Sequence, residues 1–205
     1  MLIGISLGPG DPKLMTFKAA EALQSCVKVF VPGEMAAELA RPYCNPKILE
    51  FPMIEDREEL ERIWDRNAEM VAAFATKGPT GFATIGDVNT FSTFSHLKKA
   101  VLQKDPQIAV ETIPGVGVVP SLAARFGEAL DRSFQVSDGT PVDAVIRMKA
   151  TRPKKMAEEL RTQGFEEFIL GSRLCTPQEM IVRGAPEEMP ERSDYFSVLL
   201  ARRRR

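Results

Sequence analysis

The sequence predicts an α/β protein with two α/β domains, the first built on a mostly parallel sheet and the second on a mixed sheet. Strand-like and helix-like segments alternate through residues 1–114, as in sheets whose parallel strands are joined by helices. Glycine-bearing turns follow three of the predicted strands. In residues 115–205 strands outnumber helices, which is typical of a more open, mixed sheet.

The elements of the first half follow from apolar spacing and from capping signals. Thr16 is a residue type that caps helix N-termini, and a segment with one apolar face follows it. Asp56 and Glu59 have the spacing of a capping box and open the clearest helix, which Lys77-Gly78-Pro79 ends. Strands are predicted at residues 2–7, 27–31, 48–51, 80–85 and 108–113, and a third helix at about residues 93–102.

The stretch Pro114-Gly115-Val116-Gly117 is interpreted as the junction between a first domain, residues 1–114, and a second domain, residues 115–205. A short helix is predicted at residues 121–126 and a longer one at residues 154–163. Strands are predicted near residues 134–136, 144–148, 168–170, 180–182 and 196–200.

Composition excludes several classes of protein. The 205 residues are 44% hydrophobic and 27% charged with a formal net charge of -1, so nothing indicates a nucleic-acid partner. We interpret the run Arg202-Arg203-Arg204-Arg205 as a solvated tail, with a binding role as the less favoured alternative. No signal peptide is recognised and no apolar run approaches the roughly 18 residues of a membrane span, so no membrane partner is expected.

The cysteines predict neither a disulfide framework nor a metal site. Cys26, Cys44 and Cys175 lie far apart and form no Cys-x-x-Cys pair, and His96 is the one histidine. We therefore expect a cytoplasmic protein without a bound metal.

The turn Gly8-Pro9-Gly10-Asp11-Pro12 follows the first strand and resembles a phosphate-binding loop only at first sight. A dinucleotide fingerprint needs a third glycine, which is absent, and Asp11 would repel a pyrophosphate. No Gly-Lys-Ser/Thr follows, so a P-loop is excluded as well. In isolation, a purely structural turn is an equally good interpretation.

Two later turns change that balance. The segment TIGDVNTFSTFSHL (84–97) and the segment ETIPGVGVVPSLAARFG (111–127) also begin at strand ends. Three such turns would converge on one crevice at the carboxyl edge of an open α/β sheet, where ligands bind. Their backbone N–H and C=O groups can bind an adenine, a ribose or an amino-acid moiety.

At these motifs the sequence resembles a known family. GPGDP-x-L-x-T near the start, Gly86-Asp87 at a strand end and E-x-IPGV after it resemble the tetrapyrrole methylases, which are class III S-adenosylmethionine enzymes. FPMIEDREELERIW (51–64) and GDVNTFSTFSHL (86–97) resemble the branch that methylates C-20 of precorrin-2 or of cobalt-factor II in corrin biosynthesis. The family's usual Gly-Asp-Pro is here Gly86-Asp87-Val88, and the segment between Pro32 and Pro42 is shorter than in that branch.

The resemblance implies S-adenosyl-L-methionine as cofactor, a tetrapyrrole substrate, a homodimer and a cofactor site in the cleft between the domains. It implies substrate contacts at Gly10, Asp11, His96 and Arg41, and packing of Met148 against the cofactor. The cofactor contacts that it implies are Pro9, Ile85, Gly86, Asp87, Thr90, Ser92, Thr93, Gly117, Val118, Met148 and Leu174.

Each functional interpretation has a structural alternative. His96 could equally lie on a helix surface, and Asp87 could form an Asx-turn instead of facing the N–H groups of the ring. Arg41, Arg125, Arg132, Arg147 and Lys149 could meet the ring carboxylates, although a solvated surface position is favoured for any one of them. The competing functions are a methylase acting at another ring carbon and a non-catalytic tetrapyrrole-binding protein.

Overall fold

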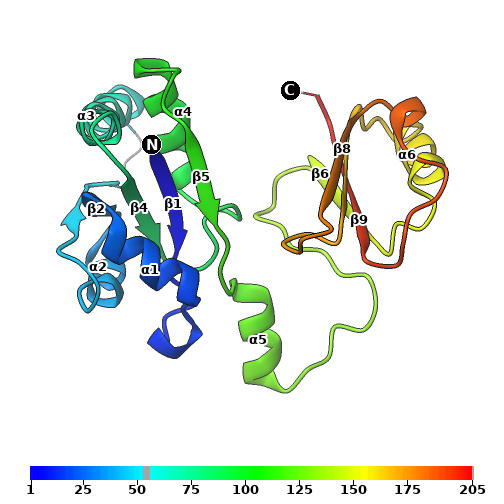
Figure 1. Ribbon diagram of the computed structural model, residues 1–205, viewed down its shortest axis with the longest axis horizontal. Coiled ribbons are helices and arrows are strands. Elements are labelled where there is room, and N and C mark those ends of the chain that lie inside the picture. Colours follow the sequence, from blue (N-terminus) through cyan, green and yellow to red (C-terminus); the bar gives the residue numbers. More distant parts are fainter. Residues whose placement is uncertain (53–55, 205) are drawn as a thin grey trace. The chain divides into compact units, whose positions relative to one another are not determined.

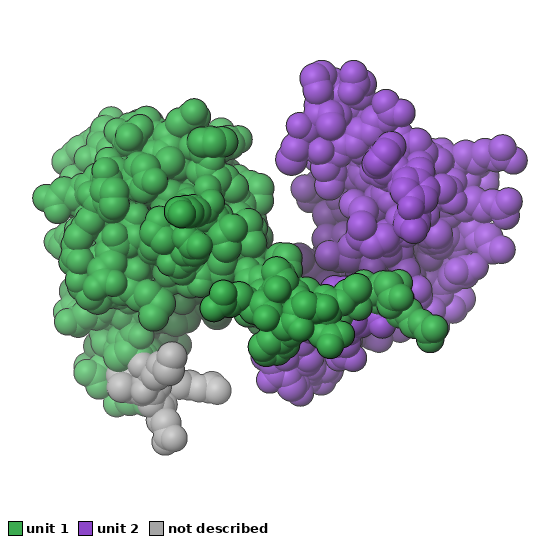
Figure 2. All heavy atoms as spheres, turned by 90° about the horizontal axis from the view of Figure 1, so that it is seen from below, with its two compact units in different colours: residues 1–132 green, residues 133–205 purple. Residues whose placement is uncertain are grey.

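The computed structural model describes residues 1–52 and 56–204, and the chain forms two compact units, residues 1–132 and 133–205 (Figure 2). The domain boundary predicted from the sequence lies at 114/115. Helix α5 (Val118–Phe126) lies between that position and the division at 132/133, so its contacts group it with the first unit. The boundary at 114/115 stays a prediction about the folding domains.

The first unit is built on a parallel sheet of five strands in the order β3-β2-β4-β1-β5 (Figure 1). The mostly parallel first sheet is therefore confirmed. Its strands are β1 (Leu2–Ser6), β2 (Lys28–Val31), β3 (Lys47–Ile48), β4 (Thr80–Thr84) and β5 (Val110–Ile113).

Helices cover both faces of this sheet. Helices α1 (Phe17–Ser25) and α2 (Glu34–Ala40) pack in one apolar cluster with Ile3 and Ile5 of β1. Helices α3 (Arg57–Ala75) and α4 (Phe94–Lys104) pack in a second cluster, on Leu2 of the same strand. Because successive strand residues point to opposite faces, β1 contributes to both cores.

The predicted caps are confirmed, and one helix was missed. The Thr16 hydroxyl accepts a hydrogen bond from the Ala19 N–H (3.2 Å), and Asp56 Oδ1 accepts from the N–H groups of Glu58 (3.0 Å) and Glu59 (3.2 Å). The helix that was not predicted from the sequence is α2. This helix has seven residues and no side-chain cap, so burial of its alanine-rich face against the sheet stabilises it rather than any local signal.

The second unit is a four-stranded sheet in the order β6-β9-β7-β8, and each neighbouring pair is antiparallel. The prediction of a mixed sheet is thus wrong in this detail, although the two α/β units are confirmed. Residues 134–136 form no strand, because they are exposed and have no strand partner. The strands are β6 (Ala144–Met148), β7 (Glu167–Ser172), β8 (Met180–Gly184) and β9 (Ser197–Arg202).

One face of the second sheet is covered and the other is open. Helix α6 (Pro153–Arg161) contributes Ala157 and Leu160 to the core on the covered face. On β6, Ile146 and Met148 are 63% and 67% exposed. Two short 3-10 helices, η1 (Pro12–Leu14) and η2 (Pro186–Glu188), complete the described elements.

The arginine run does not behave as a free tail. Arg202 is the last residue of β9. Arg203 donates hydrogen bonds from Nε to the Val142 carbonyl and from Nη1 to the Gly164 carbonyl, both at 3.2 Å. Its guanidinium also lies over the Phe165 ring, 4.6 Å from the centroid. The interpretation as a wholly solvated tail is therefore wrong for these two residues.

Candidate functional site

The turns after β1 and β4 are joined directly at the carboxyl edge of the first sheet. The strands are parallel neighbours, and the Leu7 N–H donates to the Thr84 carbonyl at 2.9 Å. One step further, the Gly86 N–H donates to the Gly8 carbonyl at 2.7 Å. Both glycines have positive φ, 76° for Gly8 and 77° for Gly86, a conformation that other residues rarely adopt.

The turn after β5 joins the same cluster through Gly115. Its N–H donates to Asp87 Oδ2 at 3.0 Å. A Cβ on Gly115 would lie 2.5 Å from the Ser6 Cβ and 3.3 Å from the Gly86 carbonyl oxygen. Only glycine permits this close approach, so the three turns predicted to converge do converge within the first unit.

Asp87 organises this cluster. Its Oδ1 accepts hydrogen bonds from the Asn89 N–H (2.9 Å) and the Thr90 hydroxyl (3.2 Å), while its Oδ2 accepts from Gly115. The first of these bonds is an Asx-turn, the structural alternative considered above. The hydrogen bond from Gly115 connects two turns that are distant in the sequence, and it could not be predicted from the sequence.

Val88 makes a contact that the family's usual proline could not make. The buried Val88 N–H donates to the Ser6 hydroxyl, at the end of β1, at 2.9 Å. Proline has no N–H. This departure from the common motif therefore attaches the turn after β4 to the neighbouring strand.

The topology makes this edge a place for ligands. The chain leaves β1 toward α1 on one face and leaves β4 toward α4 on the other. Adjacent parallel strands with diverging connections form the crevice in which open α/β sheets bind ligands. The turns at this edge contain predicted site residues Pro9, Gly10, Ile85, Gly86, Asp87, Thr90, Ser92, Thr93 and Gly117.

Two further predicted site residues, Asp11 and Val118, lie at the starts of the helices η1 and α5. Asp11 is the N-cap of η1, where its Oδ1 accepts from the Lys13 N–H at 2.9 Å. Val118 begins α5 and is 66% exposed, so its side chain is available for a contact.

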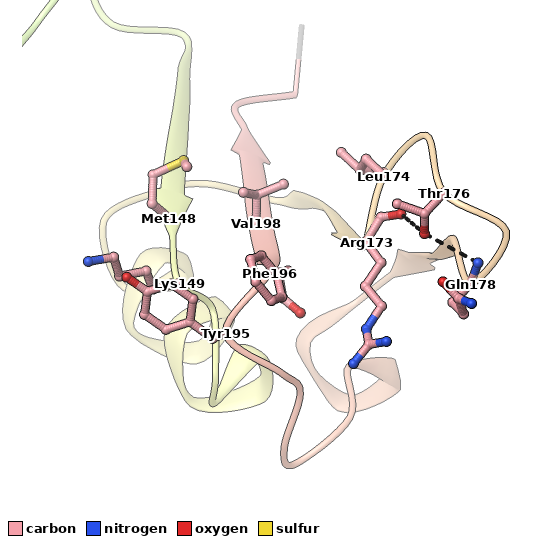
Figure 3. A pocket seen from close by; sticks show the side chains of 10 residues that line it. Met148, Lys149, Arg173, Leu174, Thr176, Gln178, Tyr195, Phe196 and Val198 are labelled. Atoms are coloured by element: carbon pink, nitrogen blue, oxygen red, sulfur yellow. Dashed lines mark hydrogen bonds between the residues drawn. The ribbon is translucent and has the colours of Figure 1, made fainter.

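The second unit contains an open pocket of about 590 Å³ at the end of β6 and the start of β9 (Figure 3). It brings together the two predicted cofactor contacts of this unit, Met148 and Leu174, which lie 26 positions apart in the sequence. Tyr195 and Phe196 also line it, and neither was predicted from the sequence. Two adjacent aromatic residues before an apolar strand were the available signal.

Two residues that line the pocket have strained backbone angles, and a hydrogen-bonded ion pair lies next to them. Arg173 and Lys149 have positive φ values of 49° and 55°, and such strain concentrates at binding sites. Arg173 Nε donates to Asp194 Oδ2 at 2.6 Å, and this hydrogen bond is the main cause of the lowered pKa of Asp194. Asp194 Oδ1 in turn accepts from the Phe196 N–H at 2.8 Å, which fixes the start of the aromatic wall.

Leu174 is fixed by a glycine beneath it. A Cβ on Gly171 of β7 would lie 2.8 Å from a Leu174 methyl group, so the leucine side chain packs directly on the strand backbone. Leu174 is nevertheless 45% exposed. It therefore presents apolar surface to the pocket from a fixed position.

The predicted substrate contacts His96 and Arg41 have protein partners. His96 is exposed on α4, and its ring lies 4.6 Å from that of Trp64 on α3. Arg41 Nη2 pairs with Glu34 Oε1 at 2.6 Å, and the two residues lie at opposite ends of helix α2. Among the other basic candidates, Lys149 lies over the Tyr195 ring, 5.0 Å from its centroid.

Within residues 1–52 and 56–204, no group of three or more His, Cys, Asp or Glu side chains could hold a metal ion. None of the described helices is both long and apolar enough to cross a membrane. The three cysteines are free.

Comparison with known proteins decides the family. A family model described as "Tetrapyrrole (Corrin/Porphyrin) Methylases" matches residues 1–190. The chain belongs to this family.

Relatives and solved structures agree with this assignment to the tetrapyrrole methylases. The "Probable cobalt-precorrin-2 C(20)-methyltransferase" of Methanocaldococcus jannaschii is 30% identical over 98% of this chain and 95% of its own length. The "Precorrin-2 C(20)-methyltransferase" of Sinorhizobium sp is 25% identical over 97% of this chain and 94% of its own. The crystal structure of the methyltransferase CobJ has the same fold, with a TM-score of 0.51 at 20% identity over 100% of this chain and 95% of that one.

Proposed function

We propose that this tetrapyrrole methylase is an S-adenosylmethionine-dependent C-methyltransferase of cobalamin biosynthesis that methylates C-20 of precorrin-2 or cobalt-factor II. The observation that carries the proposal is the near full-length similarity to a C(20)-methyltransferase. The convergence of three backbone-rich turns at the carboxyl edge of the first sheet supports it.

The residues fit the proposed cofactor. Exposed Met148, Leu174 and Phe196 offer apolar and aromatic surface for an adenosine, in a pocket of a size that small-molecule ligands fill. The turns at Gly86 and Gly115 bring polar backbone near the edge of the first sheet. The predicted cofactor cleft between the two domains stays a prediction.

The chemistry places few demands on side chains. The bound cofactor supplies an electrophilic methyl group on a sulfonium. The protein holds the electron-rich ring carbon at about 3–3.5 Å from that methyl group and excludes water, and such alignment contributes up to roughly 7–11 kcal/mol. In this proposal Asp87 positions the ring by accepting hydrogen bonds from its N–H groups.

Calorimetry and a methylation assay test the proposal. We expect one S-adenosylmethionine or S-adenosylhomocysteine to bind per chain. Incubation with the cofactor and each ring form, followed by NMR, should locate the new methyl group at C-20. Binding of NAD or ATP with no binding of either cofactor form would contradict the proposal, and a methyl group at another carbon would favour the alternative methylase.

A non-catalytic tetrapyrrole carrier is the second candidate. Its one supporting observation is Val88 in place of the usual proline, and the hydrogen bond from Val88 to Ser6 weakens that support because the turn remains ordered. A carrier would bind the ring without binding the cofactor.

We further propose a cytoplasmic location, in keeping with three free cysteines.

A further inference from the structure

A separate open pocket of about 440 Å³ lies beside the turn after β4, entirely within the first unit. Trp64 of α3 and His96 of α4 form one side of it. Val88, Phe91 and Thr93 line it from the turn and the start of α4. The Val88 N–H also donates to the Ser6 hydroxyl at the end of β1, so this pocket lies next to the carboxyl edge of the sheet.

Phe91 is held in a conformation that folding alone does not explain. Its φ is 48°, in the left-handed region that disfavours residues with a Cβ, and it is 68% exposed. An exposed ring contributes little to the core, and glycine adopts a positive φ without strain, as Gly86 does in the same turn with a φ of 77°. Strain of this kind persists mainly at functional sites.

The rest of the pocket offers polar groups that are free to bind a ligand. Among the described residues, the Trp64 indole N–H, the Thr93 hydroxyl and the His96 imidazole make no hydrogen bond to protein. By contrast, the first N–H groups of α4 are partly occupied, since Phe94 N–H donates to the Ser92 hydroxyl at 3.2 Å. A ligand in this pocket would therefore meet aromatic faces and side-chain donors.

We propose that this pocket receives one edge of the conjugated tetrapyrrole substrate, with the Phe91 ring against the flat face of the macrocycle. The inference rests on the proposed function and adds a substrate-binding residue to it. Flat conjugated systems pack on aromatic rings in offset or edge geometry. The ring's peripheral carboxylates would then accept hydrogen bonds from Trp64 and His96.

The chain carries a reporter of ring binding, and the Phe91 variants assign that binding to this pocket. Trp64 is the one tryptophan, and its ring is 4.6 Å from that of His96. Tetrapyrroles absorb the light that indole emits. Titration of the full-length protein with the octacarboxylate uroporphyrin should therefore quench Trp64 fluorescence to saturation.

The decisive variant is Phe91→Gly, because it removes the ring and relieves the backbone at the same time. We expect unchanged or higher stability in urea, and a Kd for uroporphyrin raised about tenfold. With cobalt-factor II, KM should rise by a similar factor while kcat changes little. This result is expected because Phe91 would contact the ring equally in the ground state and in the transition state. Calorimetric affinity for S-adenosylmethionine should stay at the wild-type value.

Phe91→Tyr is the matched control, because it keeps the aromatic face and should bind uroporphyrin like the wild type. Wild-type Kd in Phe91→Gly, or an equal loss in Phe91→Tyr, would overturn the inference. The inference would also be overturned if Phe91→Gly changed the sedimentation coefficient of the protein but not its Kd for uroporphyrin. Phe91 would then belong to an interface between two copies of the chain. If the Kd responds as expected but wild-type protein methylates no ring, the pocket stands and the proposed function fails.

Discussion

At the residue scale, the presence of valine instead of proline at position 88 permits a hydrogen bond between the Val88 N–H and the Ser6 hydroxyl at the carboxyl edge of the first sheet. Both groups are buried, and they are each other's partners at 2.9 Å. Restoring the family's usual proline would remove the N–H and leave the Ser6 hydroxyl without this partner. The departure from the motif is thus compensated within the turn.

We expect Val88→Pro to lower the free energy of unfolding by about 1–3 kcal/mol, the cost of a buried polar group that loses its hydrogen bond. Urea denaturation followed by circular dichroism measures this change. The double variant Ser6→Ala with Val88→Pro should recover part of the loss, because no unpaired hydroxyl remains. Equal stability of Val88→Pro and wild type would show that the hydrogen bond is dispensable.

Both carboxylate oxygens of Asp87 accept hydrogen bonds, one of them from Gly115. An asparagine would keep the Asx-turn through its Oδ1 but not the bond from Gly115. An asparagine amide nitrogen cannot accept, so Asp87→Asn should cost roughly 1–3 kcal/mol of stability as well as ring affinity. The free energy of unfolding, measured beside kcat/KM, tests this. A folded Asp87→Asn protein of wild-type stability but lower kcat/KM would favour a role toward the ring alone.

Burial raises the pKa of the Cys26 thiol from 9.0 to about 11, with Cys44 adding to the shift. The folded state therefore holds this proton more tightly than the unfolded state. The resulting stabilisation is complete below about pH 9 and is lost as the pH rises through about 11. Iodoacetamide at pH 8 should modify the exposed Cys175 first, and Cys26 only as the pH approaches 11. Peptide mass spectrometry reports the order, and fast modification of Cys26 at pH 8 would contradict it.

At the scale of elements, strands and long helices were predictable and short or non-local features were not. The caps of α1 and α3 and the span of β6 agree with the sequence analysis, because they depend on local spacing. Helix α2 and the failed strand at residues 134–136 depend on which partner surface is available. A short segment gains its conformation from such packing.

Strand β9 leads to a prediction for the arginine run. Arg203→Ala should destabilise the second unit by about 1 kcal/mol, because it removes two hydrogen bonds and a contact with the Phe165 ring. Arg204→Ala is the control, since the exposed Arg204 makes no such contact in the described part of the chain. Thermal unfolding of both variants measures the difference. Equal melting temperatures would restore the interpretation of a solvated tail.

At the scale of the whole molecule, the exposed apolar surface supports the predicted homodimer. Phe17 of α1 is 91% exposed and Met35 of α2 is 67% exposed, and both helices pack on the same face of the first sheet. A symmetric pair is the commonest way to bury such surface. Sedimentation at micromolar concentration should give twice the chain mass of 22.7 kDa. A monomer across that range would contradict the homodimer.

The sequence by itself determined the family, the alternating architecture of the first half and the three glycine turns, since each depends on residue types at short spacing. Only the tertiary structure decided how those turns meet. Asp87 and Gly115 are joined by a hydrogen bond across 28 positions, and Met148 meets Leu174 in a pocket with two unforeseen aromatic residues. The strain at Phe91 was also invisible, because a backbone angle at an exposed residue leaves no mark in composition or periodicity. Contacts between distant segments depend on strand order, and strand order is fixed by the packing of both faces of the sheet at once.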